Sequence, residues 1–512
     1  MAVSFNYIPS NMRVPLFYAE MDNSAANTAT GEKKSLLIGL MTAGTAEPNV
    51  PVLVSTGAKG KTLFGRGSQL ALMAEAYRNN DSAGELWCLP QVLATGESDD
   101  NADDAVGIGT AAQGYVTFTG TALAAGTVAF YVGGTKVAAT ITAGMTASQA
   151  TAALAAAINK DGDLPVSAVV NPSDLTQLVL TCKGLGAYGN DIQLAVNRQK
   201  AVGGEENVSG LGVVLTAMSG GTGVADVEKA FEKVATETYL FIGIGENDAT
   251  TLDAVKTEMN DASGRWAYSR MQYGHVFTAK RGDDTTLVTF GSTRNDQHVT
   301  VFGIEPQHPD PYWLLAAAAT GREAVFITND PARPTQTGVL IGCSYPAIED
   351  RFNLAERNTL LHNGIATTYT SGGYCRIERA VTTYQVNSFG DADNSYLDSE
   401  TLFTLAEITT RLKTAITSKY PRHKLASDGT RYGAGQAIVT PSVIRGELIA
   451  QYAAMENLGL VENADLFAQY LIVERNADDP NRVDVLFPPD LVNQLRVFAL
   501  LNQFRLQYSE QA

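Results

Sequence analysis

The sequence contains little cysteine and histidine, and this scarcity excludes several kinds of site. There are four cysteines and five histidines among 512 residues. The cysteines lie far apart and form no C-x-x-C pair, which disfavours a disulfide framework or a zinc site and fits a reducing compartment. The histidines show no H-E-x-x-H pattern. We therefore expect no metal and no other cofactor.

Long apolar runs are also missing. The longest one, residues 313–319, is much shorter than the about 20 residues that a helix needs to cross a bilayer. The first residues of the chain contain no apolar stretch of the length found in signal peptides. The sequence therefore predicts no membrane contact by this chain itself.

The chain lacks a positive charge balance. Lysine and arginine total 37 against 54 acidic residues, which gives a net charge of −17. Such a balance disfavours a duplex nucleic-acid partner, and any electrostatic partner would need a local patch. With 45% hydrophobic residues the chain can build real cores. At about 150 residues per domain, its length suggests three to four domains.

Alternating apolar runs and amphipathic stretches indicate an α/β core domain made of residues 36–95 and 224–390. We expect an open, mostly parallel sheet with helices on both faces. A helix is expected after Ser68, because apolar residues recur there at helical spacing. Residues 1–35 read as an arm, since prolines interrupt any regular element. The expected strands are residues 35–40, 52–54, 86–89, 239–244, 276–279, 299–304 and 324–327.

Residues 96–223 have a different texture and indicate an inserted, mainly β domain. Residues 95–114 read as an acidic, glycine-rich linker, and residues 203–223 as a second glycine-rich boundary. Between them, Gly133-Gly134 separates two apolar runs and predicts a two-residue hairpin. Thr146 and Gln149 have the spacing of a capping box and predict the start of a helix.

Residues 391–512 indicate an α+β C-terminal domain that carries an extended end. One helical stripe runs from Leu402 to Ile416, and a second runs from Ile444 to Leu458 with Gly459 placed to end it. The last stretch, residues 495–507, is apolar, contains aromatics and has high β propensity. At a chain terminus, such a strand can lack a partner within its own chain.

Residues 55–62 form the best candidate for a catalytic motif. They end in Gly60-Lys61-Thr62, as a phosphate loop does, but the first glycine of that pattern is replaced by Ser55. We expect a surface loop between a strand and a helix here. The sequence Gly243-x-Gly245 lacks the third glycine of a dinucleotide-binding loop, because residue 248 is Asp.

Two carboxylate pairs, Asp99-Asp100 and Asp283-Asp284, stand in polar surroundings close to glycine or asparagine. An acid–base pair needs burial that separates its two pKa values, so solvated turns are the better interpretation. We assign no catalytic residue and predict that the chain is not an enzyme.

A basic cluster stands out in the C-terminal part, where 21 residues contain one acid, Asp428. A solvated helix face and an anchor for an acidic protein surface both explain it. Nucleic acid is disfavoured because aromatic stacking partners are sparse. The cluster consists of Arg411, Lys413, Lys419, Arg422, Lys424 and Arg431.

Six stretches spread over the whole chain resemble one known family of proteins. The core signature of that family is similar to ERNTLLHNG at 356–364 and YCRIERAVTTY at 374–384. The two ends are similar as well, in IPSNMRVPLFYAEMDNS at 8–24 and PPDLVNQLRVFALLNQFRLQ at 488–507. Two further stretches are FGRGSQLALMAEAYR at 64–78 and GNDIQLAV at 189–196. Together these stretches resemble contractile tail sheath proteins of Mu-like phages.

The resemblance implies a structural, non-enzymatic subunit of the virion tail, assembled in the host cytoplasm. Copies of such a subunit polymerise around an inner tail tube, and contract to drive the tube through the host envelope. The implied partners are other copies of the chain, the tube protein, and baseplate and tail terminator proteins. The inserted domain is expected to face outward, and the basic cluster to face the tube.

The resemblance also implies that both terminal arms add strands to the sheets of neighbouring copies. Pairing of this kind would satisfy the backbone of an otherwise unpaired strand. The expected arm residues are Val14, Leu16, Tyr18, Leu495, Val497, Ala499, Leu501, Phe504 and Leu506. Two other functions remain open at this point. One is a nucleotide-binding enzyme that uses Lys61, and the other is a surface-decorating protein that binds a ligand through residues 96–222.

Overall fold

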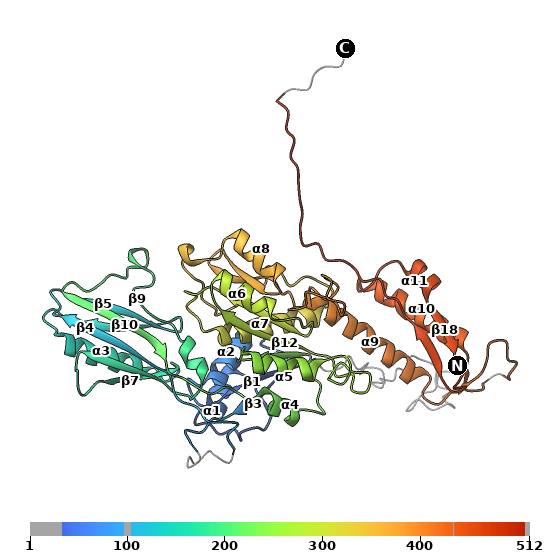
Figure 1. Cartoon of the computed structure of the whole chain (residues 1–512), viewed down its shortest axis with the longest axis horizontal. Coiled ribbons are helices and arrows are strands. Elements are labelled where there is room, and N and C mark those ends of the chain that lie inside the picture. Colours follow the sequence, from blue (N-terminus) through green and yellow to red (C-terminus); the bar gives the residue numbers. More distant parts are fainter. Residues whose placement is uncertain (1–32, 97–103, 434, 507–512) are drawn as a thin grey trace, which may run out of the picture.

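A computed structural model describes residues 33–96, 104–433 and 435–506. Three units follow one another along the longest axis of the molecule (Figure 1). A β-rich unit lies at one end, a large sheet covered by helices lies in the middle, and a smaller helical unit lies at the other end. The last described residues project from the body as an extended segment.

The middle unit is an eight-stranded mixed sheet in which the six central strands are parallel. Its strand order is β15-β14-β13-β12-β11-β1-β3-β2, with antiparallel β15 and β2 at the two edges. The expected open, mostly parallel sheet is thus confirmed. The strands are β1 (Lys34–Leu40), β2 (Val52–Leu53), β3 (Glu85–Gln91), β11 (Phe241–Ile244), β12 (His275–Arg281), β13 (Val299–Ile304), β14 (Ala366–Ser371) and β15 (Tyr374–Arg379).

Helices cover both faces of this sheet, because successive side chains of a strand point to opposite sides. On β1, Leu37 packs with α2 (Gln69–Asn80) and α7 (Tyr312–Asn329). Its neighbours Leu36 and Ile38 pack with α4 (Val227–Lys233) and α5 (Ala249–Met259) on the opposite face. A smaller core joins α6 (Asp284–Ser292) to α8 (Leu354–His362).

The strand expected at residues 324–327 is wrong, because these residues form the last part of α7. A four-residue apolar run fits a buried helix as well as a buried strand, and only its surroundings decide between them. Here the run continues a helix that contains the four alanines 316–319, all fully buried. Alanine is the strongest helix former, so the whole segment is helical.

The β-rich unit consists of a four-stranded and a three-stranded sheet with one helix, α3 (Ala147–Lys160). The strand orders are β10-β4-β8-β7 and β6-β5-β9. The chain enters this unit after β3 and returns to the large sheet with α4, as expected for an insertion. The strands are β4 (Gln113–Gly120), β5 (Gly126–Val132), β6 (Thr135–Ile141), β7 (Val166–Val170), β8 (Gln177–Cys182), β9 (Leu194–Val196) and β10 (Leu211–Ser219).

Two local expectations for this unit are confirmed, and two are corrected. Gly133 and Gly134 both have positive φ and connect β5 to β6 as a tight hairpin. Thr146 and Gln149 form the capping box of α3. The glycine-rich boundary at 203–223, however, contains β10, a nine-residue strand that pairs with β4. The segment 95–114 is also more than a linker, because Ile108 pairs with Ala94 and residues 113–114 belong to β4.

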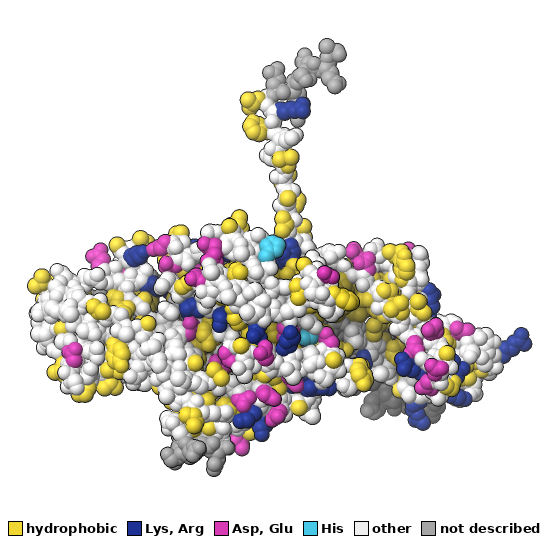
Figure 2. All heavy atoms as spheres, in the orientation of Figure 1, with side chains coloured by type: hydrophobic (Ala, Val, Ile, Leu, Met, Phe, Trp, Pro, Cys, Tyr) yellow, Lys and Arg dark blue, Asp and Glu magenta, His cyan; other side chains and the backbone are white. Residues whose placement is uncertain are grey.

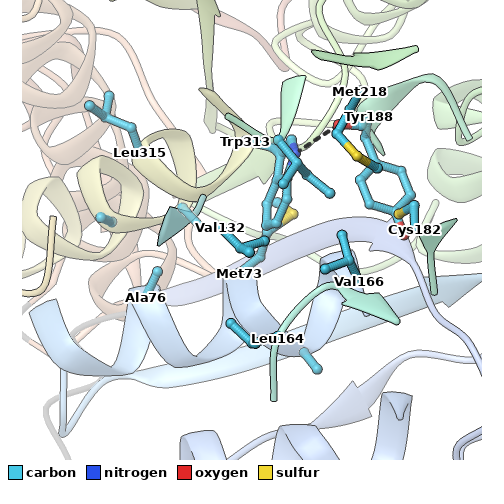
Figure 3. Packing of buried hydrophobic residues seen from close by; sticks show 14 of the residues in the cluster. Met73, Ala76, Val132, Leu164, Val166, Cys182, Tyr188, Met218, Trp313 and Leu315 are labelled. Atoms are coloured by element: carbon cyan, nitrogen blue, oxygen red, sulfur yellow. Dashed lines mark hydrogen bonds between the residues drawn. The ribbon is translucent and has the colours of Figure 1, made fainter. Parts of the chain in front are cut away.

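The β-rich unit shares a continuous core with the large sheet (Figure 3). Trp313 of α7 packs edge-on against Tyr188 with ring centres 5.7 Å apart. The Trp313 Nε1–H also donates a hydrogen bond to the Tyr188 carbonyl oxygen at 3.3 Å. Both residues are fully buried. The inserted unit is therefore packed onto the body through side chains of both parts.

The C-terminal unit is joined to the body by α9 (Ser399–Lys419), a helix about 31 Å long. Phe403 near its start packs on Phe241 of the large sheet, with ring centres 5.2 Å apart. Ile408 belongs to the separate core of the C-terminal unit. The other elements are β16 (Lys424–Leu425), β17 (Ile438–Val439), α10 (Pro441–Asn457), α11 (Ala464–Tyr470), β18 (Ile472–Arg475) and β19 (Val483–Leu486).

The described part of the chain contains no helix with the length and apolarity of a membrane span. The long apolar run at 313–319 lies in α7, in the core that the large sheet shares with the β-rich unit.

Candidate functional site

The C-terminal segment from Leu495 to Leu506 is extended and projects away from the body (Figure 1). No hydrogen bond joins residues 497–504 to any other described residue. Apolar side chains nevertheless line the segment (Figure 2), and Leu501 is 82% exposed. Water is a poor solvent for such a row of side chains, and an unpaired backbone here is free to take up a partner strand. We call residues 495–506 the C-terminal arm.

Both faces of the C-terminal arm are apolar. In an extended chain, alternate residues share a face, so Leu495, Val497, Ala499 and Leu501 lie on one side. Phe504 and Leu506 fall on the other side, together with Phe498 and Leu500, which the sequence prediction left out. A strand that is apolar on both faces is typical of a position covered on both sides. The expected C-terminal arm residues are thus all exposed, but they belong to two faces.

The chain is held firmly just before the arm. The Tyr452 hydroxyl donates a hydrogen bond to the Glu462 carbonyl oxygen at 2.7 Å and accepts one from the Asp490 N–H at 3.1 Å. Tyr452 also stacks on Phe467 at 3.7 Å between ring centres. Leu491 forms a β-bridge with Val461. The segment that precedes the arm therefore belongs to the core of the C-terminal unit.

Residues at the base of the arm contact the loop after α7. The Gln494 side chain donates to the Ala332 carbonyl oxygen at 3.2 Å, and Gln336 donates to the Leu495 carbonyl oxygen at 3.4 Å. The guanidinium of Arg496 lies 3.1 Å from Asp398 and 2.9 Å from Glu400. Sequence reasoning missed Arg496, because its partners are almost 100 residues away and no local pattern links them.

The same unit contains a small sheet with open edges. Among the strands of the described residues, β18 and β19 pair only with each other, from Ile472 opposite Leu486 to Arg475 opposite Val483. Ile472 and Leu486 are side by side and at least half exposed. A two-stranded sheet is marginally stable on its own in water. Further strands could be added at either edge of this hairpin.

The six residues of the basic cluster are exposed or partly exposed, but they do not form one stripe. Lys413 and Lys419 are about 120° apart around α9. Arg411 pairs with Glu407 at 2.8 Å, and Lys419 pairs with Glu447 at 2.6 Å. This end of the molecule shows acidic as well as basic side chains (Figure 2). Within the described ranges, four cluster members make no ion pair, namely Lys413, Arg422, Lys424 and Arg431. Lys424 donates a hydrogen bond to the Gln436 side chain.

The segment that resembles a phosphate loop is a helix, so the expectation of a surface loop is wrong. Helix α1 (Gly57–Phe64) begins at Thr56, whose hydroxyl accepts from the Lys59 N–H at 3.2 Å. Lys61 is used for structure, since its ammonium lies 2.8 Å from Glu75 and 3.1 Å from Asp163. The backbone N–H groups that a phosphate would need are committed to the helix.

The carboxylate pair Asp283-Asp284 opens a helix. The Asp283 side chain accepts from the Thr286 N–H at 2.7 Å and caps α6. The other pair, Asp99-Asp100, and the expected N-terminal arm residues Val14, Leu16 and Tyr18 lie outside the described residues. Across the described ranges, no group of three or more histidine, cysteine or acidic side chains could hold a metal ion.

Several solved structures are similar to this chain. The sheath tail protein from Desulfitobacterium hafniense matches with a TM-score of 0.48 at 12% identity, covering 94% of this chain and 97% of that one. The sheath tail protein from Listeria innocua matches with a TM-score of 0.48 at 11% identity, covering 92% and 94%.

The sequence comparisons are more specific. The family model of the phage tail sheath protein central domain matches residues 220–383, and that of the phage tail sheath C-terminal domain matches residues 391–505. The Mu-like prophage FluMu tail sheath protein of Haemophilus influenzae is 40% identical over 512 residues, which covers 99% of this chain and all of that protein. The chain therefore belongs to the phage tail sheath protein family.

Proposed function

We propose that copies of this chain polymerise helically around an inner tail tube and contract to drive that tube through the host envelope. The observation that carries the proposal is the C-terminal arm, which is extended and apolar on both faces, and whose residues 497–504 make no hydrogen bond to any other described residue. The role is mechanical, with no bond chemistry. The two alternatives, a nucleotide-binding enzyme and a surface-decorating protein, have no comparable support.

The C-terminal arm is suited to join copies by strand addition. A strand that pairs with a sheet edge of another copy gains main-chain hydrogen bonds and buries its side chains. Such a contact joins two different surfaces, so it passes from copy to copy without closing. Repeated contacts of this kind generate a helical filament.

The hairpin of β18 and β19 is the acceptor that we assign to the arm. No other strand of the described residues pairs with its edges, and Ile472 and Leu486 offer apolar surface next to them. An added strand would convert a marginal two-stranded sheet into a stable larger one. We extend the same role to the N-terminal arm, residues 1–35 with Val14, Leu16 and Tyr18, so that each hairpin could receive arms from two different copies.

The remaining parts receive roles that follow from this arrangement. Residues 36–95 with 224–390 form the body, residues 96–223 face outward, and residues 391–512 carry the intersubunit contacts. The basic cluster faces an acidic inner tube, and baseplate and tail terminator proteins contact the ends of the polymer. Assembly takes place in the host cytoplasm. Contraction draws on a difference in contact free energy between two packings of the same copies.

A truncation tests the role of the C-terminal arm. The chain 1–496 keeps every contact at the base, including those of Tyr452 and Arg496. It removes residues 497–504, which make no hydrogen bond to any other described residue, together with the residues that follow them. We expect the full chain to form tubes in electron micrographs and the truncated chain to remain monomeric in sedimentation. Normal tubes from the truncated chain would refute strand donation.

Point variants provide a matched comparison on the same arm. Leu501→Asp places a charge on an apolar face, and we expect it to reduce polymer formation strongly. Gln503→Asp places the same charge at a position that is already polar, and we expect little effect. In the acceptor, Leu486→Asp should mimic Leu501→Asp. Equal behaviour of Leu501→Asp and Gln503→Asp would argue that the arm is not buried in the polymer.

A further inference from the structure

The base of the C-terminal arm ends in a cluster of charged side chains that is almost closed to water. Arg496 is 10% exposed, whereas Val497, the next residue, is 78% exposed. The Arg496 Nη2 atom lies 3.1 Å from Asp398 Oδ1 and 2.9 Å from Glu400 Oε1. The change from a buried to an exposed side chain therefore falls between two consecutive residues.

The partners of Arg496 come from several elements of the body. Asp398 and Glu400 stand at the start of α9. Two nitrogens of the Arg379 guanidinium, on β15, also donate hydrogen bonds to the two Asp398 oxygens at 2.7 and 2.8 Å. Glu400 is fully buried and accepts hydrogen bonds from the Thr335 N–H and hydroxyl. The arm is thus tied to a helix, to an edge strand and to the loop after α7.

Arg496 supplies one of the two guanidinium groups in this cluster. Burial and the nearby charge of Glu400 raise the pKa of Glu323 well above its ordinary value. Two guanidinium groups, those of Arg379 and Arg496, face the carboxylates of Asp398 and Glu400. Withdrawal of Arg496 would leave Glu400 buried without its cation, which is a costly state. The base of the arm is accordingly the last part of it that should move.

We propose that Arg496 is a positioning residue that fixes where, and in which direction, the C-terminal arm leaves the body, so that the arm pivots after residue 496. This inference deepens the proposed function and rests on it. A fixed base limits the space that residues 497–506 must search before they meet an acceptor, and it transmits any pull on the arm directly to α9. A charge cluster suits this task because guanidinium–carboxylate pairs fix an orientation, which apolar contacts do not.

Distance measurements on the unassembled chain test the inference separately from assembly. One spin label replaces Val497 and a second replaces the exposed Ala355 on α8, in a chain with Cys343→Ser. We expect a sharp distance distribution in the parent and loss of its maximum in Arg496→Gln. Arg496→Lys keeps the charge but loses the planar guanidinium whose Nη2 atom contacts both carboxylates, and should give an intermediate width. A sharp distribution in Arg496→Gln would overturn the inference.

Two further variants keep the test decisive. Glu400→Gln removes one partner without stranding a buried charge, so it should fold even if Arg496→Gln does not, and it should broaden the distribution partly. Arg66→Gln breaks an exposed pair with Asp163 far from the arm and should leave the distribution unchanged. An unchanged distribution in Glu400→Gln, or a broadened one in Arg66→Gln, would count against the inference.

Comparison with the truncation separates the two proposals. If the chain 1–496 fails to polymerise while Arg496→Gln keeps a sharp distribution, strand donation holds and the positioning role falls. The opposite pair of results is that Arg496→Gln broadens the distribution while the chain 1–496 polymerises normally. Arg496 would then fix the base of the arm, but the arm would have no role in assembly. The positioning role that we propose would therefore be refuted as well. The inference predicts a loss of both the sharp distribution and regular tubes in Arg496→Gln.

Discussion

Arg281 of β12 and Asp191 of the inserted unit form a two-pronged ion pair, with N–O distances of 2.6 and 3.0 Å. Both side chains are 12% exposed. Asp191 also accepts the Tyr312 N–H at 2.8 Å, at the start of α7. This one carboxylate therefore ties the inserted unit to the large sheet and to its longest covering helix.

Asp191→Asn should reveal how much the Asp191–Arg281 ion pair contributes to the free energy of unfolding. The substitution leaves the buried guanidinium of Arg281 without its counter-charge, so we expect the free energy of unfolding to fall by about 3 kcal/mol. Urea denaturation measures the change. The matched control is Arg66→Gln, which breaks an exposed pair and should change stability little. Equal effects of the two substitutions would mean that the inserted unit is not held through Asp191.

Deleting the inserted unit should be harmful to an otherwise unchanged chain. The sheath hypothesis predicts that tubes form without residues 96–222, but the deletion would uncover Trp313 and other apolar side chains of the shared core. We expect the deleted chain to aggregate. A second deletion that also carries Trp313→Gln should be more soluble and should still form tubes. Ordered tubes from the first deletion would show that the shared core is dispensable.

Glu246 should make the stability of the chain depend on pH. Burial raises the pKa of this carboxyl from 4.5 to about 7, although Gln69 donates a hydrogen bond to it at 3.4 Å. Because the folded chain binds the proton more tightly, the group favours folding below pH 4.5 and loses this contribution as the pH rises through 7. One pKa unit corresponds to about 1.4 kcal/mol, so the ionisation of Glu246 lowers the free energy of unfolding by about 3 kcal/mol in total.

Glu246→Gln removes this titration and keeps the shape of the side chain. We expect the variant to be more stable than the parent at pH 8 and to lose that advantage toward pH 4.5. Denaturant midpoints measured at several pH values would show the difference. Parallel curves for parent and variant would mean that Glu246 is already ionised in the folded chain at neutral pH.

Lys61→Ala tests the nucleotide-binding alternative. Because the Lys61 ammonium pairs with Glu75 and Asp163, we expect no ATP binding by either parent or variant in calorimetric titration. The substitution should lower stability by at most about 1 kcal/mol, as for other partly solvated ion pairs. A saturable ATP signal in the parent that the variant lacks would reopen the enzymatic hypothesis.

Charge reversal tests whether the basic cluster contacts the inner tube. Changing Lys413, Lys419 and Lys424 to Glu should impair co-assembly with tube but spare sheath-only polymers. Lys419→Glu would also face Glu447, so the cleaner set reverses residues that make no ion pair in the described chain. We choose Lys413, Arg422 and Arg431, and leave out Lys424 because its ammonium donates a hydrogen bond to Gln436.

The control reverses three exposed lysines outside the C-terminal unit, Lys59, Lys160 and Lys233, and changes the net charge by the same amount. Co-sedimentation with tube is the measurement. Equal loss in both sets would indicate a general effect of net charge. Loss of sheath-only polymers in the cluster variant would instead assign these residues to folding or to contacts between copies.

The elements that the sequence predicted correctly are those whose signals are local. Gly133-Gly134 allows the backbone angles of a tight hairpin, and Thr146 with Gln149 satisfies the first N–H groups of α3. The stripe from Leu402 to Ile416 marks one face of α9. The extended, apolar character of the C-terminal arm was also visible, because each feature depends on residues a few positions apart.

The features that only the tertiary structure decided depend on residues far apart in the chain. Residues 324–327 are helical because they continue α7 against the sheet, and β10 exists because β4 lies beside it. The ammonium of Lys61 is occupied by Asp163, 102 residues away, and Arg496 is held by Glu400, 96 residues away. Burial gives such pairs their strength, and burial is a property of the packed chain that local spacing does not encode.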